Sequence, residues 1–198
     1  MFFDDSLIQY HLKNKIQQSS AAGKYHLEQQ MVICDGACRA DMALFTGDET
    51  HGFAIKSDRD SLAHLGRQIE HLGRFFDRLT IVTGHHWGEV SARTPPWVGV
   101  LMATQDENGE FCWVRARAGG RSPHTDPRLA SQVLWRSYLQ ERLTALQGQP
   151  PPASWCRARL ADHLITLCGA DGARREVLKF LHWRRTAPPI SLTGWDVR

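Results

Sequence analysis

Apolar residues dominate two short stretches of the chain, in a pattern that predicts a hairpin of two strands. The stretches are residues 39–45 and 51–56, and the five residues between them include a Gly-Asp pair, which favours a tight turn. Successive residues of a strand point to opposite faces of its sheet. Residues 54 and 56 therefore share one face, and a charged residue of the first strand, Asp41, can lie beside them.

The same criteria predict the other elements. Apolar residues that recur every three or four positions indicate helices, and runs of β-branched residues indicate strands. The predicted helices cover residues 5–18, 57–77, 128–146, 154–168 and 173–185, and the further strands cover residues 79–83, 98–103 and 111–117. Residues 118–126 read as a flexible loop and residues 186–198 as an extended tail. Strand, strand, helix, strand is an α/β order, with the last connection parallel and right-handed.

The charged residues of the hairpin suggest a chemistry. An aspartate on one strand, with an acid and a lysine two residues apart on the next, is what a magnesium-dependent phosphodiesterase requires. Magnesium prefers carboxylate, carbonyl and water oxygens, and it lowers the pKa of a bound water that then attacks phosphorus. Asp41 and Lys56 supply the aspartate and the lysine. Ala54 stands where the second carboxylate is expected.

These residues resemble the core of the PD-(D/E)XK nuclease superfamily, with Ala54 in the place of the glutamate of its ExK element. An ordered series of residues is similar to an uncharacterised bacterial family of PD-(D/E)XK-like proteins that carries a locus-style name. The series consists of residues 36–41, 52–62, 68, 76–77 and 96–97, and the likeness extends to residues 134–136 and 157–164. It covers most of the chain.

The resemblance implies a fold and a set of roles. The fold is an α/β restriction-endonuclease-like core, a mixed sheet flanked by helices, followed by a C-terminal helical region. Asp41 and the Ile55 carbonyl would bind Mg²⁺ or Mn²⁺, and Lys56 would act on the water or the phosphate. Gln68 matches a glutamine near the metal-bound water. The acid that completes the metal shell would be Glu28, although the spacing from Asp41 favours position 30, a glutamine.

The alanine at position 54 removes a metal ligand, and two explanations remain open. The chain is either a nuclease inactivated by a glutamate-to-alanine change or a natural pseudonuclease that keeps the fold in order to bind. Ile55, Lys56 and the two residues that follow match the motif. A decayed site often loses such residues as well, which favours the inactivated form.

Charge is distributed unevenly along the chain, whose formal net charge is +3. Residues 1–110 contain 10 Lys and Arg against 15 Asp and Glu, whereas residues 111–185 contain 13 against 5. Arginine forks suit phosphate oxygens. The arginines that we expect to contact nucleic acid, DNA in the first place, are Arg59, Arg67, Arg115, Arg117 and Arg121, and Arg115 and Arg117 share one strand face. A solvated surface is the alternative.

The composition of the chain argues against a membrane protein, a secreted protein and a zinc-binding protein. No apolar run is long enough for a membrane span, and the acidic start does not resemble a secretory leader, so we expect a cytoplasmic protein. Five cysteines without a CxxC pair indicate reduced thiols rather than a zinc site. His85 and His86 follow the strand at residues 79–83, and we expect them to hold the loop rather than a ligand.

We therefore predict a nuclease core over residues 1–126 and a basic helical region over residues 127–198. The leading function is a metal-dependent nuclease that cuts DNA and lacks its catalytic glutamate in the present form. The alternative is an inactive pseudonuclease that binds nucleic acid or a protein partner. A phage-defence or toxin-system component that needs a second protein is a third class, and a homodimer is compatible with each.

Overall fold

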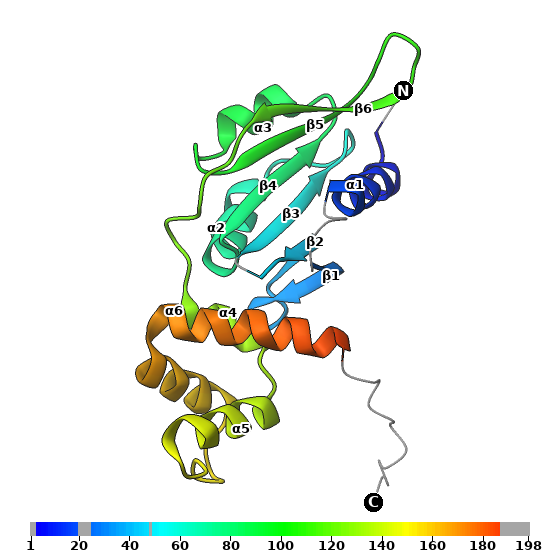
Figure 1. Cartoon of the computed structure of the whole chain (residues 1–198). Helices are drawn as coiled ribbons and strands as arrows, with labels where there is room; N and C mark the ends of the chain where they lie inside the picture. Colours follow the sequence, from blue (N-terminus) through cyan, green and yellow to red (C-terminus); the bar gives the residue numbers. More distant parts are fainter. Residues whose placement is uncertain (1–2, 20–24, 48, 187–198) are drawn as a thin grey trace, which may run out of the picture.

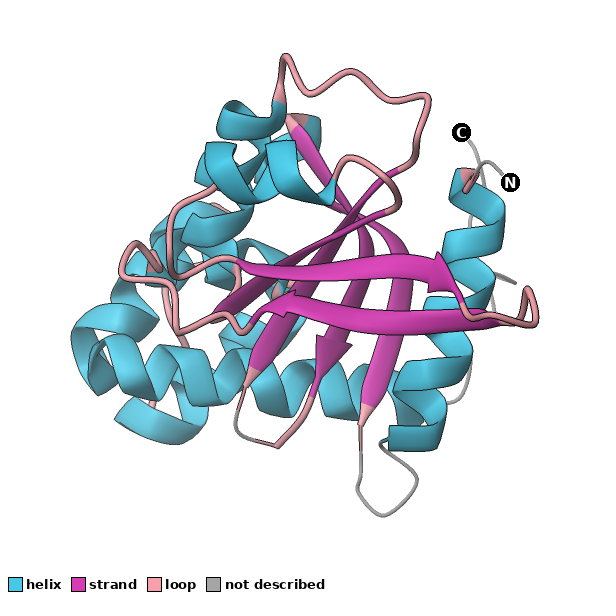
Figure 2. Ribbon diagram, turned by 90° about the horizontal axis from the view of Figure 1, so that it is seen from above, coloured by secondary structure: helices cyan, strands magenta, loops and turns pink. Residues whose placement is uncertain are grey.

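The protein is a six-stranded mixed sheet with helices on both faces (Figures 1 and 2). The computed structural model describes residues 3–19, 25–47 and 49–186. The strands are β1 (His26–Ile33), β2 (Cys38–Phe45), β3 (Thr50–Lys56), β4 (Arg78–Thr83), β5 (Gly99–Gln105) and β6 (Phe111–Arg117). The helices are α1 (Asp5–Ser19), α2 (Leu65–Phe75), α3 (Trp87–Arg93), α4 (Pro127–Ala130), α5 (Arg136–Gln147) and α6 (Arg157–Thr186), and the short 3₁₀ turns are η1 (Cys34–Gly36) and η2 (Ser131–Val133). This architecture confirms the predicted α/β class with a C-terminal helical region.

The strands lie in the sheet in the order in which they occur along the chain. β1, β2 and β3 are antiparallel neighbours, β3, β4 and β5 are parallel, and β5 and β6 form an antiparallel hairpin. The parallel pairs need crossover connections, which α2 and α3 provide. The hairpin turn is held by the Asp106 carboxylate, which accepts the backbone N–H groups of Asn108 and Glu110. The five predicted strands are confirmed, whereas β1 and α3 were not predicted.

Each face of the sheet has its own apolar core. On one face, α1 buries Ile8, Leu12 and Ile16 against Phe53 and Val82, as its helical periodicity predicts. Burying a side chain of this size contributes roughly 1.5–3 kcal/mol. The other face packs against α2, α3 and the C-terminal helices through residues that include Leu65, Ile69, Leu72, Val90, Leu164, Val177 and Leu181.

α2 begins several residues later than its apolar pattern predicts. A helix from residue 57, as predicted, could be capped by Ser57 or Asp58, but the helix begins at Leu65. Both side chains are engaged elsewhere. The Ser57 hydroxyl donates to Asp60, and the Asp58 carboxylate accepts the backbone N–H groups of Phe3 and His85. Asp58 thus ties the N-terminus to the loop after β4, and the prediction that His85 holds this loop is confirmed.

The C-terminal helices agree with the predicted ones at one break and differ at another. The single helix expected over residues 128–146 is divided into α4, η2 and α5, and Leu146 near its end is 47% exposed. The two helices expected on either side of Gly169 and Gly172 are confirmed, because α6 consists of two helical segments that meet in a kink at Gly169, whose φ is +70°. A positive φ suits glycine because it has no Cβ.

The C-terminal helices share an apolar cluster with the sheet. Leu164 and Phe180 of α6 belong to the same cluster as Phe45 and Ile81, and α6 contacts β1 and β2 (Figure 1). The division of the chain at residue 126 stays a prediction. Residues 118–126 are not a free loop, because Ser122 donates its hydroxyl to the Gly73 carbonyl and its N–H to the Asp77 carbonyl.

The described residues agree with two further expectations. None of their helices has the length and apolar content that crossing a membrane requires. The five cysteines are free.

A buried carboxylate joins the sheet to α6. Asp77, between α2 and β4, accepts the N–H and hydroxyl of Thr50 at 2.8 and 3.0 Å and two bonds from the Arg174 guanidinium at 2.8 Å each. Burial alone would raise the pKa of Asp77, but the bonds from Arg174 and Thr50 hold it below its ordinary value of 3.8.

Replacing Arg174 with methionine should lower the free energy of unfolding by about 2 kcal/mol. Loss of Arg174 leaves the Asp77 carboxylate buried without an opposite charge, which destabilises the folded state. The cost is smaller than for a fully buried pair, because Arg174 is partly exposed to solvent. Urea unfolding measures the effect. Arg175→Met is the matched control, because Arg175 is exposed. Equal losses in the two variants would contradict a specific role of the pair.

The same carboxylate should make stability depend on pH. Because the pKa of Asp77 is lower in the folded chain, its contribution is present above its ordinary pKa of 3.8 and is lost as the pH falls through the folded value. Asp77→Asn lacks this contribution at every pH. The difference in unfolding free energy between wild type and Asp77→Asn, measured by urea titrations at several pH values, should therefore shrink below pH 3.8. A constant difference would show that Asp77 titrates normally.

Candidate functional site

A cleft opens where β2 and β3 separate, near the end of β3. Its volume is about 710 Å³. Its walls come from α1, the segment from β1 to β2, β3 with the loop that follows it, and α2. The lining residues are Asp5, Val32, Gly36, Ala37, Cys38, Arg39, Asp41, Ile55, Lys56, Asp60, His64, Arg67, Gln68 and His71. The predicted catalytic residues Asp41, Lys56 and Gln68 thus lie around one cavity.

A distortion of the first two strands places Asp41 there. The register pairs Gln29 with Met42 and Met31 with Ala40, and it skips Gln30 and Asp41 between them. Gln30 has a φ of +54°, in the left-handed region. β2 also parts from β3 at this point, because their register ends at Met42. Asp41 is therefore free of strand pairing and faces the gap.

The Asp41 carboxylate bridges the gap between the strands. Its Oδ2 accepts the backbone N–H of Ile55 at 2.8 Å, and its Oδ1 lies 4.0 Å from an Arg39 guanidinium nitrogen. Burial raises the pKa of Asp41, while the Ile55 N–H, Arg39 and Lys56 act in the opposite direction. The side chain is 17% exposed, so it remains open to a ligand in the cleft.

Two more carboxylates line the cleft, and neither was named as a site residue from the sequence, which left open only an unspecified ligand from the first helix. Asp5 comes from the first turn of α1, and Asp60 from the loop after β3. Burial raises the pKa of Asp5, and the nearby charges of Asp60 and Asp41 raise it further. Asp4 and Asp5 are both of a residue type that can cap the start of α1. Asp4 takes this role by accepting the Leu7 N–H at 2.8 Å, which leaves Asp5 for the cleft.

Basic and amide groups complete the lining. Lys56 ends β3, and it forms no ion pair with any residue that the structure describes. Gln68 and Arg67 reach the cleft from α2. Arg39, His64 and His71 also line it and were not predicted. Their side chains could not be singled out from the sequence, because their contribution depends on how α2 lies against β2.

Position 54 does not belong to the cleft. Ala54 is fully buried, pairs with Ile81 of β4 and lies in the apolar cluster that contains Leu65 and Ile69 of α2. The small alanine side chain fits among these apolar residues, and a larger charged side chain there would have to displace them.

Glu28, the predicted third metal ligand, lies away from Asp41. Glu28 is on β1, where it is paired with Ala43 of β2, and its Oε2 lies 3.6 Å from the His26 Nε2. It lines a separate pocket together with Gln132 and Arg157. Within residues 3–19, 25–47 and 49–186, no group of three or more His, Cys, Asp or Glu is arranged to hold a metal ion. The oxygens available in the cleft are the Asp41, Asp5 and Asp60 carboxylates and backbone carbonyls.

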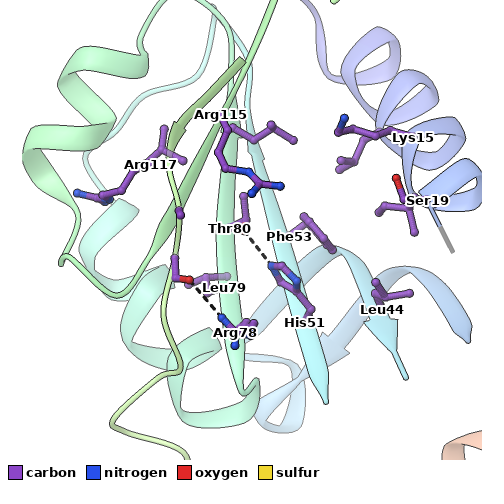
Figure 3. Close-up of a pocket in the computed structure, with 16 residues that line it drawn as sticks. Lys15, Ser19, Leu44, His51, Phe53, Arg78, Leu79, Thr80, Arg115 and Arg117 are labelled. Atoms are coloured by element: carbon purple, nitrogen blue, oxygen red, sulfur yellow. Dashed lines mark hydrogen bonds between the residues drawn. The ribbon is translucent and has the colours of Figure 1, made fainter. Parts of the chain in front are cut away.

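The arginines predicted to bind nucleic acid do not gather around the cleft. Only Arg67 lines it, and Arg59 is exposed beyond its edge. Arg121 forms an ion pair with Glu49. The prediction that Arg115 and Arg117 share a face is wrong, because a register shift between β5 and β6 places one residue out of step, and the side chains point different ways (Figure 3).

Comparisons with known proteins give one family, one protein of similar sequence and one solved structure. Protein cII of Enterobacteria phage P4 is 38% identical over 73 residues, which is 36% of this chain and 27% of that protein. The solved structure of SPO1766, a protein of unknown function from Silicibacter pomeroyi, aligns with 64% of this chain over 82% of the SPO1766 chain, with 18% sequence identity. The TM-score of 0.39 is too low to support an inference. The family described as bacteriophage P4 protein cII matches residues 5–186, and the chain belongs to this family.

Proposed function

We propose that the cleft is the active site of a metal-dependent nuclease that hydrolyses phosphodiester bonds in DNA, weakened by the alanine at position 54. The observation that carries this proposal is the convergence of Asp41, Lys56 and Gln68, from three different elements, on one cavity. The order of the elements also agrees with the mixed sheet flanked by helices that the PD-(D/E)XK resemblance implies.

The donors in the cleft fit a weakly held magnesium ion. Magnesium keeps several waters and needs only one or two carboxylates from the protein. Asp41 and the Ile55 carbonyl would hold it, with Asp5 or Asp60 as a second carboxylate in place of the one absent at position 54. When bound, the ion supplies a water of lowered pKa and neutralises phosphate charge.

The residues of the chain then have separate tasks. Lys56 carries the free ammonium that can stabilise charge developing on a phosphate oxygen. Gln68 offers an amide that can orient a water, and Arg67 offers a guanidinium fork for a second phosphate oxygen. Binding and orientation are thus divided between β3 and α2, which form opposite walls of the cleft.

A cleavage assay tests the proposed nuclease activity. Single- and double-stranded DNA and RNA are incubated with Mg²⁺ or Mn²⁺ and with the wild type, Ala54→Glu, and Ala54→Glu combined with Asp41→Asn or Lys56→Met. We expect weak or no cutting by the wild type, a gain of at least about tenfold in Ala54→Glu, and its loss in both double variants, because removing a metal ligand or a charge stabiliser typically costs about 10²–10³ in rate.

Controls separate chemistry from folding. Glu107→Gln and Lys13→Met remove an acid and a base outside the lining of the cleft and should leave cutting unchanged. Because Ala54 is fully buried, thermal melting must first show that Ala54→Glu folds. If it does not, the wild type with Mn²⁺ is compared with Asp41→Asn. Cutting that survives the loss of Asp41 would rule out this site.

The packing of Ala54 favours a second candidate, a pseudonuclease that binds nucleic acid without cutting it. A residue that fills an apolar cluster is not a vacant ligand position, and Arg39, Lys56 and Arg67 remain to contact phosphates.

This candidate predicts that affinity for DNA survives EDTA and falls steeply with salt, because each phosphate contact releases counterions. Fluorescence anisotropy at several salt concentrations measures it. Arg67→Gln should weaken binding to all sequences and reduce the slope of log affinity against log salt by about 1. The control is Arg93→Gln on α3, away from the cleft. Affinity that requires Mg²⁺ would instead support the nuclease, and salt-insensitive binding would exclude both.

A further inference from the structure

A second pocket lies at the other end of β3, under α1. Its volume is about 370 Å³, and it shares no lining residue with the cleft. α1 connects the two, because Asp5 at its start lines the cleft and Lys15, ten residues on, lines the pocket. At 1.5 Å per residue this places them about 15 Å apart along the helix. Figure 3 shows the pocket between α1 and the sheet.

Two cations at the rim of this pocket have no partner among the described residues. Lys15 comes from α1 and Arg115 from β6, and neither forms a hydrogen bond or an ion pair there. Figure 3 shows the Arg115 side chain reaching from its strand toward His51, with Lys15 across the pocket. The pocket has no acidic lining residue among those that the structure describes.

The other two arginines of the pocket are engaged. Arg78 donates to Glu49 at 2.8 Å and to the Gly119 carbonyl at 3.2 Å. Arg117 donates to the Val98 carbonyl at 2.8 Å and also to Thr94. Their charges are therefore used within the protein, whereas those of Lys15 and Arg115 are available to a ligand.

The floor of the pocket is apolar and aromatic. The His51 ring is stacked on Phe53 with centroids 4.2 Å apart, and its Nε2 is 2.8 Å from the Thr80 hydroxyl. Burial lowers the pKa of His51 to about 4, so the ring is neutral at physiological pH. The walls are apolar, and they include Leu12, Ile16, Leu44 and Leu101.

From this arrangement we propose that the pocket binds a small organic anion with a flat, largely apolar body and a single phosphate or carboxylate group. The anionic group would lie between Lys15 and Arg115, and the body would lie over His51 and Phe53. A fully hydrated inorganic anion would leave the apolar floor unused, and a cation would be repelled by both rim residues. A body of about a nucleotide's size fits a pocket at the lower end of the range for small-molecule sites.

Titration calorimetry with two kinds of probe tests this site. The probes are nucleoside 5′-monophosphates and aromatic carboxylates such as indole-3-acetate, which distinguish the phosphate source from the carboxylate source. We expect one class to bind the full chain. Arg115→Gln and Lys15→Gln should each weaken it roughly tenfold, because a hydrogen bond to a charged group contributes about 1.5–3 kcal/mol. Lys13→Gln, on the same helix but outside the pocket lining, should bind as the wild type does.

Two further probes check the two halves of the proposed ligand. The uncharged nucleoside and inorganic phosphate should both bind at least about tenfold more weakly than the nucleoside monophosphate, since each lacks one of the two contacts. The proposal is wrong if no probe binds at millimolar concentration, if the Arg115 and Lys15 variants bind as the wild type does, or if only an oligonucleotide binds. Asp41→Asn should leave this binding unchanged, so the result does not depend on whether the cleft is a nuclease.

Discussion

Arg174 reaches from α6 to the buried carboxylate of Asp77, and much of the structure depends on this contact. A carboxylate removed from water is costly unless it is paired and hydrogen-bonded. Asp77 meets both conditions, because Arg174 donates two bonds to it and Thr50 donates two more. The contact fixes three points at once: the start of β3, the end of α2 and the middle of α6. The contact also holds the C-terminal helices in one orientation on the sheet. Apolar packing alone is not directional and would not fix that orientation.

The cleft depends on that anchor because its walls are the elements that Asp77 joins. α2 carries Gln68 and Arg67, and β3 carries Lys56. At the other end of the same elements, the Asp58 carboxylate holds Phe3 and His85 and so fixes the start of α1. Between these two buried acids the Asp41 carboxylate takes the Ile55 N–H that β2 leaves unpaired. The strands can separate there because a side chain replaces the missing ladder bond.

The sequence was sufficient for the parts of the fold that depend on local periodicity. The strands around Asp41 and Lys56 follow from their apolar residues, and the grouping of Asp41, Lys56 and Gln68 followed from a resemblance. Side chains that choose between competing partners could not be assigned in this way. Asp58 could have capped α2 but binds Phe3, and Asp4 rather than Asp5 caps α1. The first choice depends on a contact between residues far apart in the sequence, and the second is a choice between two neighbouring residues of the same type.

Distortions of strand pairing could not be predicted from the sequence either. The left-handed Gln30 interrupts the pairing of β1 with β2 without changing its register, and the register shift between β5 and β6 turns Arg117 away from Arg115. A change of one residue in register moves every later side chain to the other face of the sheet. Arg117 was therefore grouped with Arg115 on the assumption of a regular strand, whereas Glu28 was assigned to the metal shell from the resemblance alone.

The charges that line the cleft are balanced. Three carboxylates, those of Asp5, Asp41 and Asp60, face three permanent cations, those of Arg39, Lys56 and Arg67. A phosphate can enter such a cleft without a metal ion, since attraction by the cations offsets repulsion by the acids. Position 54 lies outside the lining of the cleft, so the carboxylate of a glutamate there would join this balance only by displacing its apolar neighbours. Under the proposed nuclease function, a fourth carboxylate in the cleft would make a divalent cation necessary to admit the phosphate, whereas under the proposed binding function the three cations suffice.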